Sequence, residues 1–187
     1  MRRLRIQAAP AARVLAADPP WLFGDALPGA GRGASKHYPC MPIKDIMAFP
    51  LPPLDKDCIL FMWRVAAMQQ EALDVVKAWG FTLKSEIVWE KLTGGGVQGI
   101  AKEAFGMGHY VRMNHEVCLI AVRGKPVIRS HSERSMFMAP MGRHSAKPDE
   151  FYEKVEALCA GPYAELFARQ HRPGWTCYGN ELPEIGT

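Results

Sequence analysis

The sequence lacks the features that mark membrane, fibrous and disordered proteins. No stretch of 18 uncharged apolar residues occurs in its 187 residues, so no membrane-spanning helix is expected. Its 17 glycines and 15 prolines are scattered and form no low-complexity run. With 48% hydrophobic and 22% charged residues, the composition is that of an ordinary globular chain. We therefore expect a single domain over residues 1–187, without internal repeats.

The sequence also lacks metal-binding and disulfide patterns. The five cysteines form no CxxC motif, and no Cys/His pair has the spacing of a zinc site. Cys58 and Cys118 lie inside apolar runs, where thiols behave as small hydrophobic groups. His37, His131 and His144 are too dispersed to suggest a metal. These patterns predict no metal site, reduced cysteines and a cytoplasmic location.

Acidic residues are missing from the N-terminal segment, where four arginines precede the first acid, Asp18. A transit peptide has this composition, but only about ten residues precede the first expected strand. Pro10 and Arg13 interrupt the apolar part, which excludes a secretory signal. We expect residues 1–11 to be a flexible N-terminus. The net charge of +4 permits a polyanionic partner, although solvated basic faces explain it equally well.

Hydrophobic periodicity predicts alternating strands and helices. We expect strands over 12–17, 58–63, 81–89, 116–122, 164–168 and 175–178, with 127–129 as a further candidate. We expect helices over 42–49, over 68–79 and from 148 onward. This order predicts an α/β fold with a largely parallel central sheet and helices on both faces. Two glycine-containing segments, 22–40 and 91–114, are expected to be functional loops.

The quartet Asp18-Pro19-Pro20-Trp21 follows the first expected strand, and it is the strongest functional signal. Active crevices of open α/β sheets lie at the carboxyl ends of strands. The two prolines remove two amide donors, so we expect carbonyl oxygens that no local amide satisfies. A carboxylate, a carbonyl and an indole ring at one spot suit a planar base with an amino group. The alternative is a rigid strand exit with a capping Asp and a core Trp.

The chemistry of an adenine amino group explains these residue types. Its nitrogen is a poor nucleophile because the lone pair is delocalised into the ring. Acceptors on both N–H groups, here Asp18 and the Pro19 carbonyl, favour a pyramidal nitrogen whose lone pair is available. Asp18 would also stabilise the positive charge that develops on nitrogen. In-line placement of the reactants would supply much of the remaining acceleration.

The quartet resembles the catalytic signature of the DPPW-type (MT-A70-like) adenine-N6 methyltransferases, in particular their small prokaryotic and phage branch. Further landmarks follow in the family's order: Phe61-Met62-Trp63, Ala78 to Phe81, Glu86 to Lys91, Gly106 to Glu116, His144 to Glu150, Glu165 to Arg169 and Gly179 to Leu182. The resemblance covers roughly residues 12–182. It implies a Rossmann-like methyltransferase domain with a permuted motif order, in which the catalytic motif precedes the cofactor-binding strand.

The resemblance also implies S-adenosylmethionine as the cofactor. No GxGxxG loop is present, so this assignment depends on the resemblance. It assigns cofactor contacts to Asp18, Lys147, Phe167, Arg169, His171, Asn180 and Glu181. Lys147 directly precedes Pro148, so we expect it at a helix N-cap, where a cation is unfavourable unless an anion binds. The alternative is a solvated Lys147 with Ser145 as the cap.

Substrate contacts are expected mainly from the second loop. The resemblance places Tyr38 in an active-site loop, and aromatic and basic groups mix at His109, Tyr110, Arg112, Asn114 and His115. Such groups suit a flipped base and its phosphates. The alternative is a polar loop that contacts nothing.

Together these features predict methyl transfer from S-adenosylmethionine to the N6 amino group of adenine in nucleic acid. DNA is favoured because the chain is compact and has no RNA-binding appendage. RNA is the alternative polymer, and a non-catalytic subunit that binds nucleic acid or a partner is a second alternative. A homo- or heterodimer remains open, and no membrane association is expected.

Overall fold

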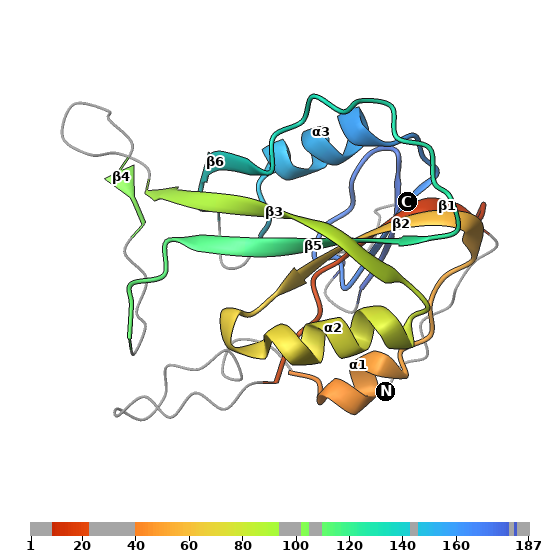
Figure 1. Cartoon of the computed structure of the whole chain (residues 1–187), viewed down its shortest axis with the longest axis horizontal. Coiled ribbons are helices and arrows are strands. Elements are labelled where there is room, and N and C mark those ends of the chain that lie inside the picture. The colour runs from red at the N-terminus through yellow and green to blue at the C-terminus, as the bar shows by residue number, and fades with distance from the viewer. Residues whose placement is uncertain are drawn as a thin grey trace.

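A single mixed β-sheet organises the molecule (Figure 1). The structure is a computed structural model that describes residues 9–22, 40–93, 102–104, 110–142, 146–179 and 182. Within these residues the strands are β1 (Ala12–Ala17), β2 (Leu54–Arg64), β3 (Thr82–Thr93), β4 (Lys102–Glu103), β5 (His115–Arg123), β6 (Met136–Pro140), β7 (Tyr163–Leu166) and β8 (Trp175–Tyr178). They lie in the order β4-β3-β5-β2-β1-β7-β8, and β6 pairs with β3.

The sheet is parallel around β1 and antiparallel around β5. Strand β1 pairs in parallel with β2 and β7, and β7 pairs in parallel with β8. Strand β5 is antiparallel to both β2 and β3, β3 is antiparallel to β4, and β6 is parallel to β3. The α/β class with mostly parallel pairing is therefore confirmed. Because β1, β2 and β7 run the same way, their carboxyl ends meet at one edge.

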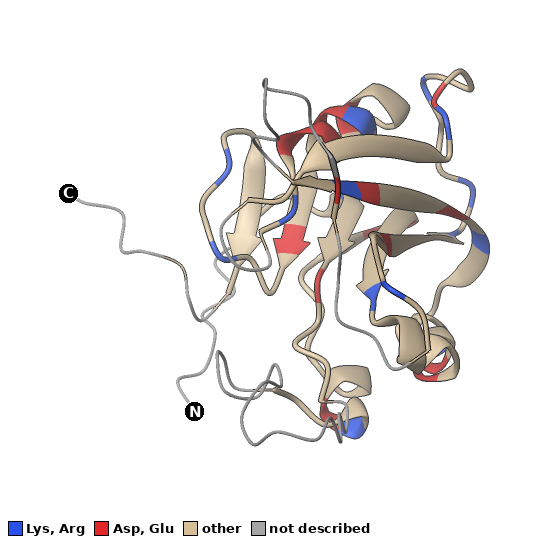
Figure 2. Ribbon diagram, turned by 90° about the vertical axis from the view of Figure 1, so that its left-hand side faces the viewer, with Lys and Arg blue, Asp and Glu red and all other residues tan. Residues whose placement is uncertain are grey.

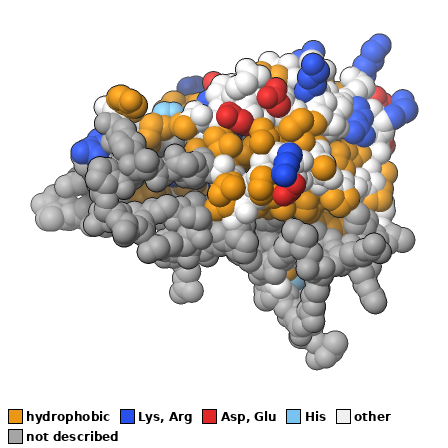
Figure 3. All heavy atoms as spheres, turned by 90° about the horizontal axis from the view of Figure 1, so that it is seen from below, with side chains coloured by type: hydrophobic (Ala, Val, Ile, Leu, Met, Phe, Trp, Pro, Cys, Tyr) orange, Lys and Arg blue, Asp and Glu red, His pale blue; other side chains and the backbone are white. Residues whose placement is uncertain are grey.

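Helices cover both faces of the sheet, as predicted (Figure 1). Helices α1 (Ile43–Met47) and α2 (Gln69–Ala78) lie on one face, with the short 3₁₀ turn η2 (Ala66–Met68) before α2. Helix α3 (Asp149–Leu158) lies on the other face. Seen from the side of α1 and α2, apolar side chains lie between the charged ones (Figure 3).

Strand alternation divides the core into two apolar clusters. Leu15 and Leu60 are buried with Val75 of α2 on one face. Val14 is buried with Val155 of α3 on the other face. Successive residues of a strand point to opposite faces, and β1 is apolar apart from its exposed Arg13, so it anchors both clusters. This burial fixes the position at which β1 ends and the Asp18 quartet begins.

The structure corrects three of the expected elements. Residues 127–129 form no strand, because Ile128 makes only an isolated bridge to Cys159. Strand β6, which the sequence did not predict, pairs with β3. Strand β7 ends at Leu166, before 168, because Phe167 adopts a positive φ of 62° that ends the extended backbone. Segment 91–114 is not all loop, because β3 continues to Thr93 and β4 lies within it.

Two further observations concern the described part of the chain. None of its helices is long and apolar enough to cross a membrane. The same residues contain no cluster of three or more His, Cys, Asp or Glu side chains arranged to hold a metal ion. Most of the expected loop 22–40 and of the expected flexible segment 1–11 lies outside the described residues.

Candidate active site

The Asp18 quartet leaves the sheet at the carboxyl end of β1, as predicted. Trp21 is buried, with 4% of its surface exposed, and its indole N–H donates to the Trp63 carbonyl at 3.1 Å. Its backbone also forms a bridge to Met41. Little of the indole face is therefore open to a base, and Trp21 holds the turn onto the core. Its stacking on a base stays a prediction.

The expectation that no local amide satisfies the proline carbonyls was wrong for Pro19. The Trp21 amide donates to the Pro19 carbonyl at 2.8 Å, and the Met41 amide donates to the Pro20 carbonyl at 2.7 Å. The turn brings the Trp21 amide back onto Pro19, and the strand-like segment at Met41 supplies the second donor. A carbonyl oxygen has two lone pairs, so the Pro19 oxygen retains one for a further N–H.

A chain of alternating charges crosses the site. The Lys147 ammonium lies 2.7 Å from Asp18 Oδ2 and 3.2 Å from Glu116 Oε2. Glu116 Oε1 in turn lies 2.6 Å from the Lys91 ammonium. Figure 2 looks toward this end of the sheet and shows basic and acidic segments close together there. The sequence placed these four residues in separate segments, and the sheet register brings them together.

The charged side chains of this network are largely buried. Only 7% of the Lys147 side chain is exposed. Burial by itself would lower the pKa of Lys147, but the Asp18 and Glu116 carboxylates outweigh it and raise the pKa. Burial would likewise raise the pKa of Glu116, but the Lys147 and Lys91 cations lower it. Lys147 and Glu116 therefore both stay charged near neutral pH.

The sequence predicted Lys147 at the helix N-cap, but Lys147 does not lie there. Pro148 is the N-cap of α3, and Lys147 lies one residue before it. Its ammonium lies 5.1 Å from the centre of the Trp63 ring, a cation–π contact. Lys147 is therefore neither a helix cap nor a solvated side chain. It is buried, and the Asp18 and Glu116 carboxylates balance its charge.

Asp18 and Lys147 open into a pocket on the α3 face. The pocket is lined by Asp18, Ala146, Lys147, Tyr152, Glu165, Phe167, Arg169 and Gln170. Four residues assigned to the cofactor from the sequence thus share one cavity: Asp18, Lys147, Phe167 and Arg169. His171 does not line this pocket and lies exposed nearby in the sequence. Asn180 and Glu181 lie outside the described residues.

Glu165 is a pocket residue that the sequence reasoning did not assign to the site. It is 9% exposed, and its Oε1 accepts a hydrogen bond from the Tyr152 hydroxyl at 2.7 Å. Burial raises the pKa of Glu165. The available signal was an acid between Ala164 and Leu166 in a buried strand, because buried carboxylates need a partner or a function.

The backbone after β7 is shaped for close approach. Phe167 lies in the left-handed region, and its ring centre is 4.6 Å from that of Phe49. The Ala168 amide donates to the Tyr178 carbonyl at 3.0 Å. A Cβ at Gly179 would collide with the Ala168 carbonyl, so only glycine fits there. Gly179 thus holds the end of β8 against the pocket wall, directly before the Asn180-Glu181 pair.

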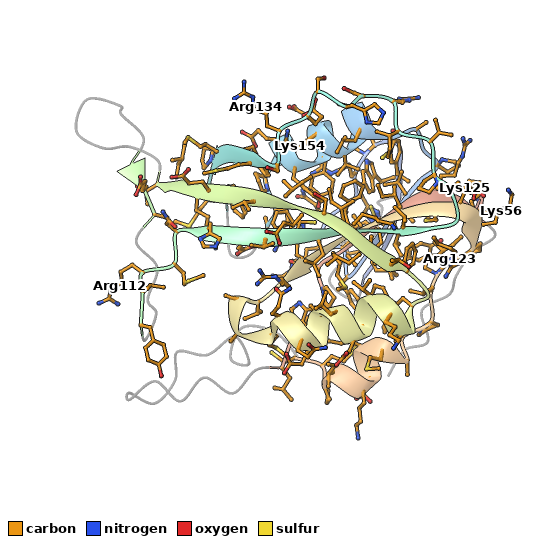
Figure 4. All side chains as sticks on the ribbon, viewed as in Figure 1. Lys56, Arg112, Arg123, Lys125, Arg134 and Lys154 are labelled. Atoms are coloured by element: carbon orange, nitrogen blue, oxygen red, sulfur yellow. The ribbon has the colours of Figure 1, made fainter. Side chains whose placement is uncertain are left out.

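The expected substrate residues are only partly gathered. Asn114 and His115 are half-buried at the start of β5, with Asn114 Oδ1 and His115 Nδ1 3.4 Å apart. Tyr110 and Arg112 are exposed beyond this edge, and Arg112 projects away from the sheet (Figure 4). The structure therefore places these four side chains around the site edge rather than in the pocket. Tyr38 and His109 lie outside the described residues.

The site combines a cation, Lys147, that can bind an anionic ligand group with a carboxylate, Asp18, that can accept a hydrogen bond from a second ligand. Asp18 is an ionisable acceptor at the end of a buried strand, and Lys147 holds it in place. A Lys ammonium has three N–H groups, and two of them point to Asp18 and Glu116, so one remains for a ligand anion. Glu165 offers a second buried acceptor on the pocket wall. An elongated ligand with a carboxylate and hydroxyl groups fits this set.

Comparison with known proteins agrees with these features. The model of the MT-A70 family matches residues 12–181. The human N(6)-adenosine-methyltransferase catalytic subunit METTL3 is 30% identical over 92% of this chain and 28% of its own length. The rice probable N(6)-adenosine-methyltransferase MT-A70-like is 28% identical over 90% of this chain and 23% of its own length. The Mycoplasma type II methyltransferase M.MunI is 28% identical over 92% of this chain and 78% of its own length.

Proposed function

The chain belongs to the MT-A70 family, and from this premise we propose that it transfers a methyl group from S-adenosylmethionine to the N6 amino group of adenine in DNA. The observation that carries the proposal is the buried Asp18–Lys147 pair at the mouth of the pocket. The chain spans only about a quarter of the length of the plant and animal relatives described above. Activity, cofactor and substrate are therefore proposals for this chain.

The pocket residues fit the proposed cofactor. Lys147 would hold the carboxylate of its methionine part with the remaining N–H group. Glu165 lines the same pocket, and its Oε1 accepts a hydrogen bond from the Tyr152 hydroxyl. A carboxylate has about four lone-pair sites, so Glu165 could accept from the two neighbouring hydroxyls of a ribose as well as from Tyr152. S-adenosylmethionine would supply an electrophilic methyl group on a sulfonium centre.

Asp18 is the proposed catalytic residue. Its carboxylate would accept one N–H of the adenine amino group, and the Pro19 carbonyl would accept the other. These bonds favour a pyramidal nitrogen, and the Asp18 charge stabilises the positive charge that develops on it. Lys147 at 2.7 Å fixes the orientation of the Asp18 carboxylate. The buried Trp21 anchors the turn that presents both acceptors.

The match lengths favour DNA over RNA. The type II methyltransferase, which belongs to a bacterial DNA-modifying class, is matched over 78% of its length. The relatives named for adenosine, the ribonucleoside, are matched over less than a third of theirs. In the proposed reaction, a target base leaves its stack to reach Asp18. Asn114, His115 and Arg112 lie at the edge where a flanking strand would pass.

A methyl-transfer assay separates the candidate functions. Purified protein is incubated with tritiated S-adenosylmethionine and either adenine-containing DNA or RNA of the same sequence. We expect label in DNA, with little in RNA. Label in RNA alone would replace DNA by the alternative polymer. Cofactor binding without any transfer would favour the non-catalytic subunit. No cofactor binding at all would contradict the proposal.

A further inference from the structure

The hydroxyl of Tyr152 lies against the one pocket carboxylate that the charge chain does not neutralise. We propose that Tyr152 is a positioning residue: its hydroxyl holds Glu165 with one oxygen turned toward the cofactor pocket. This inference depends on the proposed function, since it concerns how Glu165 receives the ribose of S-adenosylmethionine. Tyr152 lies on helix α3 and acts through Glu165, without contact to the reacting atoms.

The hydrogen bond that carries the proposal is short and buried. The Tyr152 hydroxyl donates to Glu165 Oε1 at 2.7 Å, and the two residues are only 5% and 9% exposed. Tyr152 comes from α3 and Glu165 from β7, so the bond links a helix to the strand beneath it. Both residues also line the pocket.

The Tyr152 ring is itself immobilised. The guanidinium carbon of Arg172 lies 3.5 Å from the ring centre, and Arg172 Nη2 is 2.8 Å from Asp149 Oδ1. Phe151 and Trp175 pack edge-on, with ring centres 5.1 Å and 5.4 Å from that of Tyr152. A ring clamped in this way directs its hydroxyl in one direction, and the terminal torsion of a Glu side chain is otherwise loosely determined.

The protonation states suit this task. Burial and then the Glu165 carboxylate raise the pKa of Tyr152 far above its usual range, so the hydroxyl always has a proton to donate. Burial also raises the pKa of Glu165, while the Tyr152 hydrogen bond and the Arg172 and Lys147 cations oppose that rise. Asp18 raises it further. The Cys177 thiol on the paired strand β8 and Arg169, which lines the same pocket, are further titratable or charged groups near Glu165.

Removal of the hydroxyl therefore has a specific consequence. Tyr152→Phe keeps the ring and its contacts but removes the donor that favours the charged form of Glu165. The pKa of Glu165 then rises, because the carboxylate loses a hydrogen bond. Protonated Glu165 accepts hydrogen bonds from a diol less well, so cofactor affinity falls. As the pH is lowered, this loss of affinity begins at a higher pH in Tyr152→Phe than in the wild type.

Calorimetric titration with S-adenosylmethionine from pH 5 to pH 8.5 tests the proposal. We expect Tyr152→Phe to weaken binding by about five- to tenfold at neutral pH, the effect of one buried hydrogen bond. The pH at which affinity is lost should move upward. At saturating cofactor, kcat should change by less than about twofold, because the reacting atoms are untouched.

Two further variants separate positioning from a general effect on the fold. Tyr163→Phe is the matched control, since its hydroxyl donates to the Cys159 carbonyl at 2.8 Å outside the pocket lining. It should leave both affinity and pH profile unchanged. In Glu165→Ala, which removes the acceptor, the added Tyr152→Phe change should have no further effect on affinity, because Tyr152 acts through Glu165.

The outcomes distinguish this inference from the proposed function. A wild-type protein that does not bind S-adenosylmethionine overturns both. A wild-type protein that binds, with an unchanged affinity and pH profile in Tyr152→Phe, overturns only the positioning role. Additive effects in the double variant, or an equal loss in Tyr163→Phe, also contradict it.

Discussion

The Lys147 ammonium lies 2.7 Å from the Asp18 carboxylate, although 129 positions separate the two residues. The pairing places a buried cation at the end of β1, where the first strand meets the start of helix α3. It gives the Asp18 carboxylate a largely buried counter-charge at the strand end. The same cation contacts Glu116, so Lys147 both positions the proposed catalytic residue and stabilises the site.

Replacement of Asp18 should separate chemistry from folding. Asp18→Asn retains the size of the side chain and loses its charge. We expect turnover to fall by at least about 100-fold, the scale for a lost electrostatic contact to the transition state. The fold should remain, as measured by circular dichroism. A turnover within about twofold of the wild type would remove Asp18 from the mechanism.

Replacement of Lys147 should affect both stability and cofactor binding. Lys147→Met leaves the Asp18 and Glu116 carboxylates without their shared cation, which should cost about 3–5 kcal/mol of unfolding free energy. The affinity for S-adenosylmethionine should fall by about 2–3 kcal/mol, the scale for a hydrogen bond to a charged group. Urea unfolding and calorimetry measure the two effects.

Lys154 provides the control for Lys147. It lies on α3 and pairs with Glu133 at 2.6 Å, and only 11% of its side chain is exposed. Lys154→Met removes a similar ion pair away from the cofactor pocket. It should reduce stability and leave cofactor affinity unchanged. Equal losses of affinity in both variants would assign the effect of Lys147 to the fold.

The ion pairs of Glu116 should make the free energy of unfolding decrease as the solution becomes acidic. Its folded pKa lies below the unfolded value because the Lys147 and Lys91 cations outweigh burial. Its contribution is therefore complete above the unfolded pKa, roughly 4.3, and is lost as pH falls through the folded pKa. Thermal unfolding from pH 7 to pH 3 should show a smaller loss of Tm in Glu116→Gln than in wild type. Parallel pH profiles would contradict the ion-pair account.

Arg112 should contribute a phosphate contact. It projects from the edge that holds the site, whereas Lys125 lies at the opposite end of the sheet (Figure 4). Arg112→Ala should weaken DNA binding and reduce the dependence of log affinity on log salt by about one unit. Lys125→Ala should change neither quantity. The reverse ranking would place the nucleic acid at the other end of the molecule.

The sequence predicted the site better where residues follow one another than where the fold brings them together. The apolar run at 12–17 and the two prolines after it sufficed to place Asp18 at a strand end. The link from Lys147 through Glu116 to Lys91 depends on the register of β5 against β3, and no local pattern encodes that register. Glu165 was missed because it lies in a short strand among apolar residues.

The residue types alone gave a wrong prediction at the turn after β1. Two prolines correctly predicted the loss of two donors, but the Trp21 amide reaches back to the Pro19 carbonyl. The sequence predicts stacking for the Trp21 ring because it does not show how deeply that ring is buried. Strand β6 was missed because its methionines and final proline resemble a loop, and its pairing with β3 decides its structure.

The central claim is that Asp18 directs a methyl group to the N6 atom of adenine. Mass spectrometry of nucleosides tests it most directly, after incubation of DNA with the protein and S-adenosylmethionine that carries a trideuterated methyl group. The account predicts trideuterated N6-methyldeoxyadenosine with the wild-type protein and none with Asp18→Asn. A trideuterated methyl group on another base or another atom of adenine, or equal amounts of product from both proteins, would contradict it.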